Sequence, residues 1–412
     1  RKTMSIPGSI NPLFLGAAGQ ATGYQISRSV RFNSSDSAYC GRNFTSAGNR
    51  TTFTYALWVK RSAASQPFQS LLTTPSNNFI FRFQSDSIVY YDYTGSSFNS
   101  SLQTASVYRD FSAWMHIVFV YDSTNGVSTD RIKLFVNGAR VTAFSTATYG
   151  LVYPSSNAVS YCNNNVEHRI GSDAAFAGRN LDAYLADIHF IDGQALDPSS
   201  FTEFDDNGVL QPKAYAGTYG TNGFHLPFSD NSTAAALGTD TSSNGNTWTV
   251  NNISVTAGAG NDSLVDTPTS YGTDTSGVGG VVRGNYCTWN PLRNDQNAVL
   301  TNGNLDLSTA GSVARYGTYT TIGVTSAKWY WEITAGALST DGYNVGIASA
   351  NKSATSALGS DTDSYIYLVA GTKRTNNVTL SYGASYTAGD VIGVALDLDA
   401  GTLTFYKNGV SQ

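Results

Sequence analysis

Charged residues are scarce in this chain. They make up 13% of the 412 residues and leave a formal net charge of -5, whereas soluble domains carry about 25% charged residues. This balance gives no basic footprint for nucleic acid or for an anionic membrane. We therefore expect a surface of neutral polar groups, as in β-rich modules and in particle components that neighbouring subunits cover.

Long apolar runs are also missing. The N-terminal stretch is basic and then apolar, but Pro7, Gly8, Asn11 and Pro12 interrupt it. A membrane-spanning helix needs about 20 successive apolar residues, and an export signal needs an unbroken apolar segment. We expect neither membrane insertion nor a conventional export signal.

Cysteine is rare as well. Cys40, Cys162 and Cys287 are an odd number and lack the C-x-x-C spacing of a zinc site. We expect three buried, reduced thiols. The alternative, a disulfide between Cys40 and Cys162, requires their strands to be neighbours.

One short pattern occurs twice. Residues 132–138 read I-K-L-F-V-N-G, and residues 403–409 read L-T-F-Y-K-N-G. Each is a strand that runs into Asn-Gly, the strongest short signal for a type I′ hairpin, because both central positions of that turn need positive φ. Two such hairpins, so far apart, predict two separate β-sandwiches.

The remaining patterns divide the chain into four segments. Residues 1–26 lack periodicity and are predicted to be an extended docking arm, with disorder as the alternative. Residues 27–200 alternate short strands with turns and form the first sandwich. Residues 201–285 are rich in Gly, Thr and Asn and predict a connector of loops and short strands packed on its neighbours, with a flexible linker as the alternative. Strand patterns return in residues 286–412.

Individual strands support this division. Residues 53–59 place alternate apolar side chains on one face, and residues 114–121 are apolar on both faces, as in the interior of a sheet. No segment has the pattern of an amphipathic helix. We therefore predict an all-β protein of two antiparallel sandwiches joined by a loop-rich connector.

The first sandwich resembles the laminin-G-like, concanavalin A-like jelly roll. The resemblance rests on residues 53–59, 114–121 and 132–138, and on the closing strands at 168–171 and 181–190.

The C-terminal part resembles a SPRY domain through residues 329–333, 343–348 and 389–409. In that family one or two further strands follow the last hairpin, so we expect the protein to continue beyond Gln412.

The order of these parts resembles tail-fibre and other virion appendage proteins of bacteriophages. The resemblance implies a virion location, docking of the arm on other virion proteins, recognition of host-surface glycan by the sandwiches, and a homo-oligomer, with a trimer favoured. The alternatives are a purely structural particle component without a ligand and a secreted carbohydrate-binding adhesin.

Catalysis is not expected, although the concanavalin A-like fold also carries glycoside hydrolases. Such enzymes need two carboxylates beside the scissile bond, in that fold usually from an E-x-D-x-x-E strand. The glutamates, Glu167, Glu203 and Glu332, do not fit this pattern, and neither H-E-x-x-H nor G-x-S-x-G occurs.

Calcium is the one metal that the resemblance suggests, since laminin-G-like and pentraxin-like sandwiches often bind it in loops at one end. The candidate ligands are Asp122 and Asp130, which flank an Asn-Gly turn, and Asp173. Ca²⁺ takes six to eight oxygens, of which a sequence nominates only some. Solvated turn carboxylates are the alternative, and no other cofactor is expected.

Aromatic residues are plentiful, with 25 Tyr and 20 Phe. Aromatic rings in loops stack on sugar rings, but such rings are also ordinary sheet residues. The residues predicted to stack on glycan from loops are Tyr90, Tyr91, Tyr93, Tyr149 and Tyr153.

Overall fold

The computed structural model describes residues 23–64, 66–147, 149–269, 271, 283–294, 297–309, 317–337 and 344–412. These residues form two compact units. The first comprises the described residues up to Tyr286 together with Asn302–Asn304, and the second comprises those within Cys287–Thr301 and Leu305–Gln412. The predicted arm lies outside the described residues except for residues 23–26.

The described part of the chain consists of strands, loops and short 3₁₀ helices, which confirms the all-β prediction. None of its helices has the length and apolar character needed to cross a membrane. The 3₁₀ helices are η2 (Pro75–Asn77), η3 (Ser128–Asp130), η4 (Pro198–Ser200) and η5 (Ala235–Gly238).

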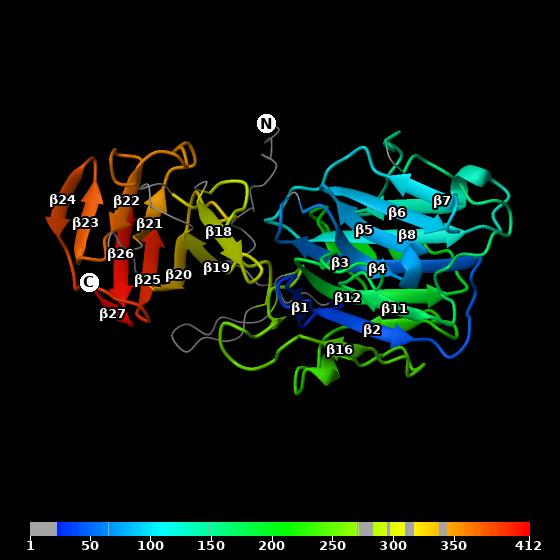
Figure 1. Ribbon diagram of the computed structural model, residues 1–412. Coiled ribbons are helices and arrows are strands. Elements are labelled where there is room, and N and C mark those ends of the chain that lie inside the picture. The colour runs from blue at the N-terminus through cyan, green and yellow to red at the C-terminus, as the bar shows by residue number, and fades with distance from the viewer. Residues whose placement is uncertain are drawn as a thin grey trace. The chain divides into compact units, whose positions relative to one another are not determined.

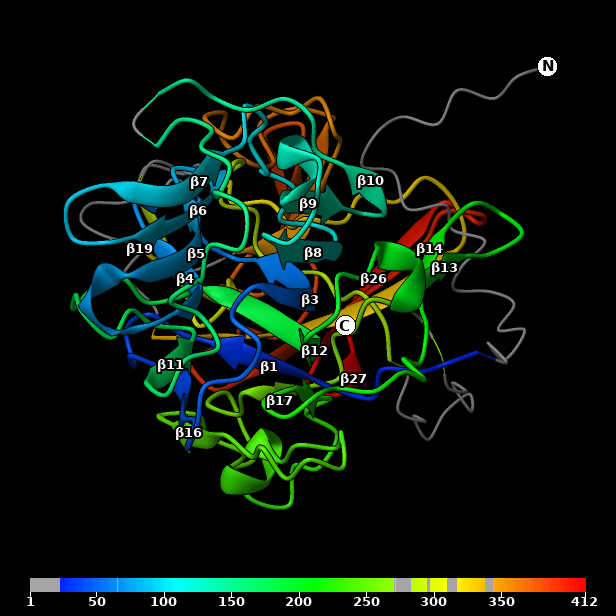
Figure 2. The ribbon, with the colours of Figure 1, turned by 90° about the vertical axis from the view of Figure 1, so that its right-hand side faces the viewer.

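Two antiparallel sheets build the first unit (Figures 1 and 2). Sheet A has the strand order β10 (Ala139–Arg140), β9 (Ile132–Val136), β8 (Met115–Asp122), β3 (Thr52–Arg61), β12 (Ala183–Asp192), β1 (Ser29–Phe32) and β17 (Ser263–Leu264), with β15 (Phe224–Leu226) also paired to β12. Sheet B has the order β16 (Thr249–Asn251), β2 (Tyr39–Asn43), β11 (Glu167–Ile170), β4 (Gln69–Thr73), β5 (Phe79–Gln84), β6 (Ser87–Tyr93) and β7 (Phe98–Gln103).

The main core lies between these sheets. Alternate residues of β3, among them Phe53, Tyr55 and Leu57, point into it and are 0% exposed. Side chains of successive strand residues point to opposite faces, so this strand confirms the predicted alternation. Phe119 of β8 fills the centre, with its ring 4.5 Å from that of Tyr90 between centroids.

The outer face of sheet A is apolar as well. Val118 and Val120 of β8 are buried there under Phe201, while Trp58 is buried with Ile26 in a neighbouring cluster. The prediction that residues 114–121 lie inside a sheet with both faces covered is therefore confirmed.

The segment predicted as a connector is part of the first unit. Its strands β15 and β17 extend sheet A, and β16 extends sheet B. Trp248 is 1% exposed and packs edge-on against Phe224, with 4.8 Å between ring centroids. A hairpin of β13 (Thr202–Phe204) and β14 (Leu210–Pro212) lies in the same segment.

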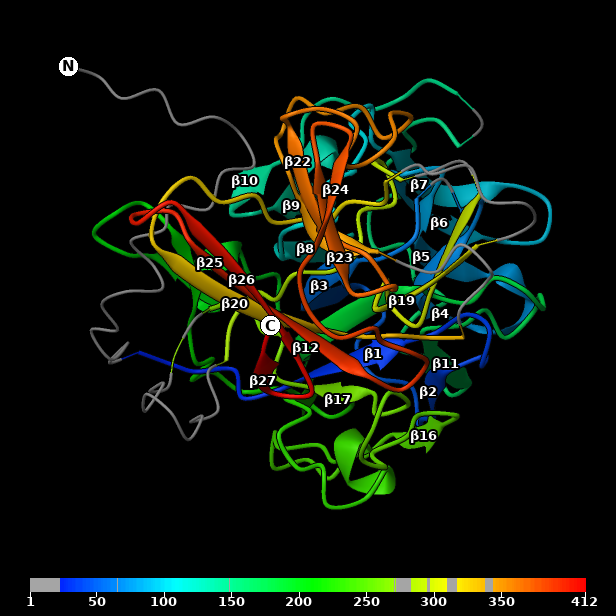
Figure 3. The ribbon, with the colours of Figure 1, turned by 90° about the vertical axis from the view of Figure 1, so that its left-hand side faces the viewer.

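The second unit contains two four-stranded antiparallel sheets (Figure 3). One has the order β20 (Lys328–Thr334), β25 (Val391–Asp397), β26 (Thr402–Lys407) and β27 (Val410–Ser411). The other has the order β21 (Val345–Ala348), β22 (Ser364–Tyr367), β23 (Thr372–Thr375) and β24 (Val378–Ser381), and a separate hairpin joins β18 (Ala298–Thr301) to β19 (Asp306–Thr309). Tyr367, Ile392 and Phe405 belong to the core of this unit.

The cysteines follow the sequence prediction only in part. Cys40 and Cys162 are buried free thiols, so the alternative of a disulfide between them is not realised. Cys287 is also free but exposed, because it lies outside the buried clusters of both units. The expectation that all three are buried was wrong for this residue.

The two Asn-Gly turns share one arrangement. Asn137 and Asn408 have φ angles of 50° and 49°. The side-chain Oδ1 of Asn137 accepts the backbone N–H of His116 at 2.8 Å, and that of Asn408 accepts the N–H of Val391 at 2.8 Å. Each asparagine therefore joins the turn to the start of the neighbouring strand, in addition to tolerating positive φ.

Replacing these asparagines tests this arrangement. We expect Asn137→Ala to lower the free energy of unfolding of the first unit, and Asn408→Ala that of the second, each by about 1–3 kcal/mol, because a strand N–H loses its acceptor and alanine is strained at positive φ. Urea unfolding measures both changes. Asn137→Asp and Asn408→Asp are the controls and should cost less, since aspartate keeps the acceptor. Equal losses in the Ala and Asp variants would contradict the explanation.

Candidate functional site

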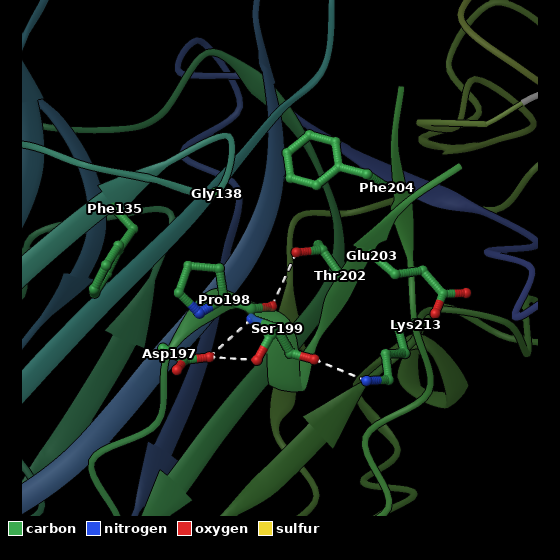
Figure 4. Close-up of a pocket in the computed structure, with 9 residues that line it drawn as sticks. All are labelled: Phe135, Gly138, Asp197, Pro198, Ser199, Thr202, Glu203, Phe204 and Lys213. Carbon is green, nitrogen blue, oxygen red and sulfur yellow. Dashed lines mark hydrogen bonds between the residues drawn. The ribbon is translucent and has the colours of Figure 1, made fainter. Parts of the chain in front are cut away.

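A hollow in the first unit lies at the β10 edge of sheet A (Figure 4). It has a volume of about 510 Å³, which is in the usual range for small-molecule sites. The lining residues come from the β9–β10 hairpin, η4, β13 and the chain after β14: Phe135, Gly138, Asp197, Pro198, Ser199, Thr202, Glu203, Phe204 and Lys213.

Local hydrogen bonds fix one wall of this hollow. Asp197 caps η4, because its Oδ1 accepts both the backbone N–H and the hydroxyl of Ser199 at 3.0 and 2.6 Å. The Thr202 hydroxyl donates to the carbonyl of Pro198 at 2.9 Å, and Lys213 Nζ donates to the carbonyl of Ser199 at 2.9 Å. Capping by aspartate and an early proline are usual at such helix starts.

Two aromatic rings stand at separate sides of the hollow (Figure 4). Phe204 is 63% exposed, and Phe135 is half-buried. Gly138 of the first Asn-Gly turn has a φ of 78°, and a Cβ there would lie 3.4 Å from the Phe204 ring. The turn therefore leaves room for Phe204. The hollow combines apolar ring faces with the carboxylates of Asp197 and Glu203 and the Lys213 ammonium, which suits a polyhydroxylated ligand.

The tyrosines predicted to lie in loops have mixed positions. Tyr90, Tyr91 and Tyr93 belong to β6, which corrects the prediction that these three lie in loops. Tyr90 is 0% exposed in the main core, where its hydroxyl and that of Ser100 are 2.7 Å apart. Since its ring has no free face, Tyr90 offers no surface for a sugar. Tyr153 is half-buried against the same core.

The other predicted tyrosines meet on the outer face of sheet B. The rings of Tyr91 and Tyr149 stack with 5.3 Å between centroids, and Tyr93 and Phe98 join the cluster. Arg82 is 1% exposed and donates from Nη2 to the hydroxyl of Tyr149 at 3.0 Å. Because Tyr91 is only 3% exposed, this cluster is packed mainly on itself.

The predicted calcium ligands are engaged by neighbouring side chains. Asp122 accepts the Thr124 hydroxyl at 2.6 Å. Asp130 pairs with Arg140 at 2.6 Å, and buried Asp173 pairs with Arg179 at 3.2 Å. Among the described residues, the three aspartates do not form a common cluster with metal-ligand spacing. Calcium binding therefore stays a prediction.

A different group has such spacing. The potential ligand atoms of Asp187, His189 and His225 all lie within 4.8 Å of one another. His189 and His225 face each other across paired strands β12 and β15, and Asp187 has a φ of 49° where the pairing of β12 with β3 shifts register. The bulge turns Asp187 toward the histidines, an effect that strand periodicity in the sequence does not reveal.

The geometry of this group favours hydrogen bonding over metal binding. The two imidazole rings are stacked, with centroids 4.2 Å apart and planes 9° apart. A metal bound by both rings would have to lie close to both planes, which nearly parallel stacked rings do not allow. Instead, His189 Nε2 lies 3.2 Å from Asp187 Oδ2 and His225 Nε2 lies 2.7 Å from Oδ1.

The remaining partners complete a buried network. Tyr24 donates its hydroxyl to Asp187 at 2.7 Å, and the hydroxyl of Tyr219 lies 2.9 Å from His189 Nδ1. Burial alone would raise the pKa of Asp187, but His189 and His225 lower it well below its usual value. Through these hydrogen bonds Asp187, in β12, links Tyr24 near the N-terminus to His225 in the segment after residue 200.

Comparisons with known families agree with the folds of the two units. Residues 33–200 match the family model described as the concanavalin A-like lectin/glucanases superfamily, and residues 328–412 match the SPRY domain. The chain therefore contains a laminin-G-like, concanavalin A-like domain followed by a SPRY domain. The search of curated proteins gave no match.

Several solved structures are similar at low identity. A heptameric SAP-like pentraxin from Limulus polyphemus has 13% identity and a TM-score of 0.30, over 42% of this chain and 80% of that one. A putative carbohydrate binding protein from Bacteroides ovatus has 13% identity and a TM-score of 0.29, over 47% and 62%. Domains LG4-5 of the mouse laminin alpha1 chain have 11% identity and a TM-score of 0.32, over 96% and 79%.

Buried histidines give the first unit a pH-dependent stability. Burial lowers the pKa of His116 to about 3 and that of His168 to about 4, and it lowers the pKa of His189 against the opposing attraction of Asp187. The unfolded chain, with histidine pKa values near 6.5, then binds protons that the folded chain does not. Burial raises the pKa of Asp92 to about 6 and also raises the pKa of Asp262, so these two groups act in the opposite direction.

We therefore expect the free energy of unfolding of the first unit to fall by about 2 kcal/mol per pH unit between pH 6 and pH 4.5, since three histidines outweigh Asp92 and Asp262. Urea unfolding at a series of pH values measures the slope. All four histidines lie in the first unit, so the transition of the second unit is an internal control. A first unit as stable at pH 5 as at pH 7 would contradict the account.

Proposed function

We propose that the first unit recognises glycan in the hollow between Phe135 and Phe204, and that it does so without catalysis. The observation that carries the proposal is an exposed aromatic ring beside carboxylates and an ammonium, in a unit whose residues 33–200 match the lectin/glucanase superfamily. Sugars present both an apolar ring face and hydroxyl groups. The hollow offers complementary surfaces for both.

Four of the lining residues have a role in this proposal. Phe204 stacks on the sugar ring, because most of its surface is exposed. Glu203 accepts hydrogen bonds from hydroxyl groups, and the Lys213 ammonium donates them. Asp197 already accepts two hydrogen bonds from Ser199, which suits a structural cap better than a general acid or base.

We further propose that the protein is a virion appendage such as a phage tail fibre. A laminin-G-like domain and a SPRY domain in series, with few charges, support a display scaffold. In this setting residues 1–26 dock on other virion proteins, the assembly is a homo-oligomer with a trimer favoured, and the ligand is a host-surface glycan. A secreted adhesin is the alternative with the same ligand.

A purely structural particle component is the second candidate. The observation that favours it is exposed apolar surface on the second unit, where Tyr330, Leu380 and Val410 are 55%, 55% and 66% exposed. Such side chains suit contact with a neighbouring protein. In this alternative the lectin-like domain packs against other subunits and binds no glycan.

A glycan array tests the binding proposal. We expect the full chain to bind a subset of glycans and Phe204→Ala to weaken that binding by at least about tenfold, because the stacking surface is lost. Phe176→Ala is the matched control, since Phe176 is 42% exposed in the same unit but lies outside the hollow. Absence of any bound glycan, or equal binding by wild type and Phe204→Ala, would contradict the proposal.

The same array tests calcium. Binding that is lost in EDTA and restored by Ca²⁺ would support ligands among Asp122, Asp130 and Asp173. Binding that survives EDTA would remove calcium from the account and leave the hollow as a metal-free site.

Electron microscopy tests the location. Particles labelled with an antibody against the SPRY domain should carry label at free distal tips if the protein is an appendage for attachment. Label flush with the shell or tail would favour the structural candidate. Detection of the protein only in uninfected cells would contradict both.

A further inference from the structure

A buried lysine, a carboxylate and a carboxamide meet on the outer face of sheet A. The side chain of Lys60 is 1% exposed. Its Nζ lies 2.8 Å from Asp266 Oδ2, 2.9 Å from Asn285 Oδ1 and 2.6 Å from the carbonyl oxygen of Tyr286. The residues come from β3 and from two stretches of chain far from it in sequence, and all belong to the first unit.

Neighbouring donors fix the orientation of Asp266. The indole N–H of Trp114 donates to its Oδ1 at 2.9 Å, and the backbone N–H of Tyr286 donates to the same oxygen at 3.3 Å. The other oxygen, Oδ2, faces Lys60. The side chain of Asp266 is 7% exposed, so the carboxylate and the amine meet in a site from which bulk water is largely excluded.

Asn285 presents its amide to the same amine. Its Nδ2 donates to the carbonyl of Ser112 at 2.5 Å, which directs Oδ1 toward Lys60. A C=O bond is about 1.23 Å long, so the amide carbon lies at most about 4 Å from Nζ. Reacting atoms held this close gain a large effective concentration.

We propose that Lys60 and Asn285 form an intramolecular isopeptide bond, with Asp266 as the catalytic proton carrier. Asp266 takes a proton from the Lys60 ammonium, and the lone pair of Nζ attacks the amide carbon of Asn285. Asp266 passes this proton to Nδ2, and its carboxylate then takes the second proton of the amine and releases it to the departing ammonia. The C–Nδ2 bond breaks, one ammonia molecule leaves, and Nζ keeps one hydrogen in the new amide. No oxidant or cofactor is consumed.

The burial of Lys60 and Asp266 favours this reaction. Transfer of the proton from Nζ to Asp266 converts a buried ion pair into a neutral pair, which removes the cost of keeping two charges out of water. Trp114 and Tyr286 hold the carboxyl group in place through both proton transfers. The ring of Tyr184 lies 5.6 Å from Nζ and covers the amine on another side.

The bond would have a mechanical consequence. It would join β3 to the segment that follows β17, so that residues 61–284 form a covalently closed loop. Tension applied on either side of this unit would pass through the bond without extending the loop. This inference does not depend on glycan binding, and it holds for an attachment protein and for a structural one alike.

The mass of the denatured full chain tests the proposal. We expect the wild-type protein to be lighter than its sequence by one ammonia molecule, and a protease digest to contain a branched peptide joining Lys60 to Asn285. In a denaturing gel the looped wild-type chain should migrate faster than Lys60→Arg, which keeps the positive charge but lacks the amine. A folded wild-type chain at full sequence mass would overturn the proposal.

Two substitutions separate the chemistry from a merely structural ion pair. Asp266→Asn should leave the chain at full mass because the proton carrier is gone. Asp262→Asn is the matched control: the Arg31–Asp262 pair has the same side-chain exposures, 1% and 7%, as the Lys60–Asp266 pair. We expect the control to retain the ammonia loss. Loss of the bond in both variants, or in neither, would overturn the role of Asp266.

Discussion

Sheet A is apolar on both faces, and the organisation of the first unit depends on covering the outer face, which points away from sheet B. Phe119 of β8 points toward sheet B, while Val118 and Val120 of the same strand point away from it. A bare sheet of this kind would expose far more apolar surface than a soluble domain tolerates. The chain covers it with residues from before β1 and after β12, including Ile26 and Phe201.

The covering segments have few apolar residues, so buried polar groups hold them in place. Asp187 accepts hydrogen bonds from Tyr24, which precedes β1, and from His225, which follows β12. Asp266 lies beside Lys60 and Trp114. Arg31 and Asp262 form another buried pair. A buried charge that loses its partner costs several kcal/mol. Each segment is therefore fixed where its charged group meets its partner, which also brings Asn285 to Lys60.

The sequence predicted the features that repeat at short range. These features are the alternation of side chains in residues 53–59, the apolar residues on both faces of 114–121, and the two Asn-Gly turns. Each depends only on residues that are close together in the sequence, and the structure confirms them. The integration of residues 201–285 into the first unit was harder to foresee, because β15, β16 and β17 have only two or three residues each and no measurable period. Their contribution depends on pairing with distant strands.

The candidate site shows the same limit. Gly138 was predicted as a turn residue, but nothing in the sequence indicates that Phe204 packs over it. Tyr90 and Tyr91 lie in a strand because the apolar run of β6 continues through them, and Tyr90 alternates toward the core. The bulge at Asp187 likewise arises from strand pairing, and it brings together His189 and His225 from separate strands.

Native-state hydrogen exchange tests most directly whether residues 201–286 form one cooperative unit with the sandwich. The account predicts that amides of β15 in their pairing with β12 exchange with an opening free energy within about 1 kcal/mol of that for amides at the centre of β3. Amides of β15 that exchange through local opening several kcal/mol below the value for β3 would show that the segment is only loosely attached, and would contradict the account.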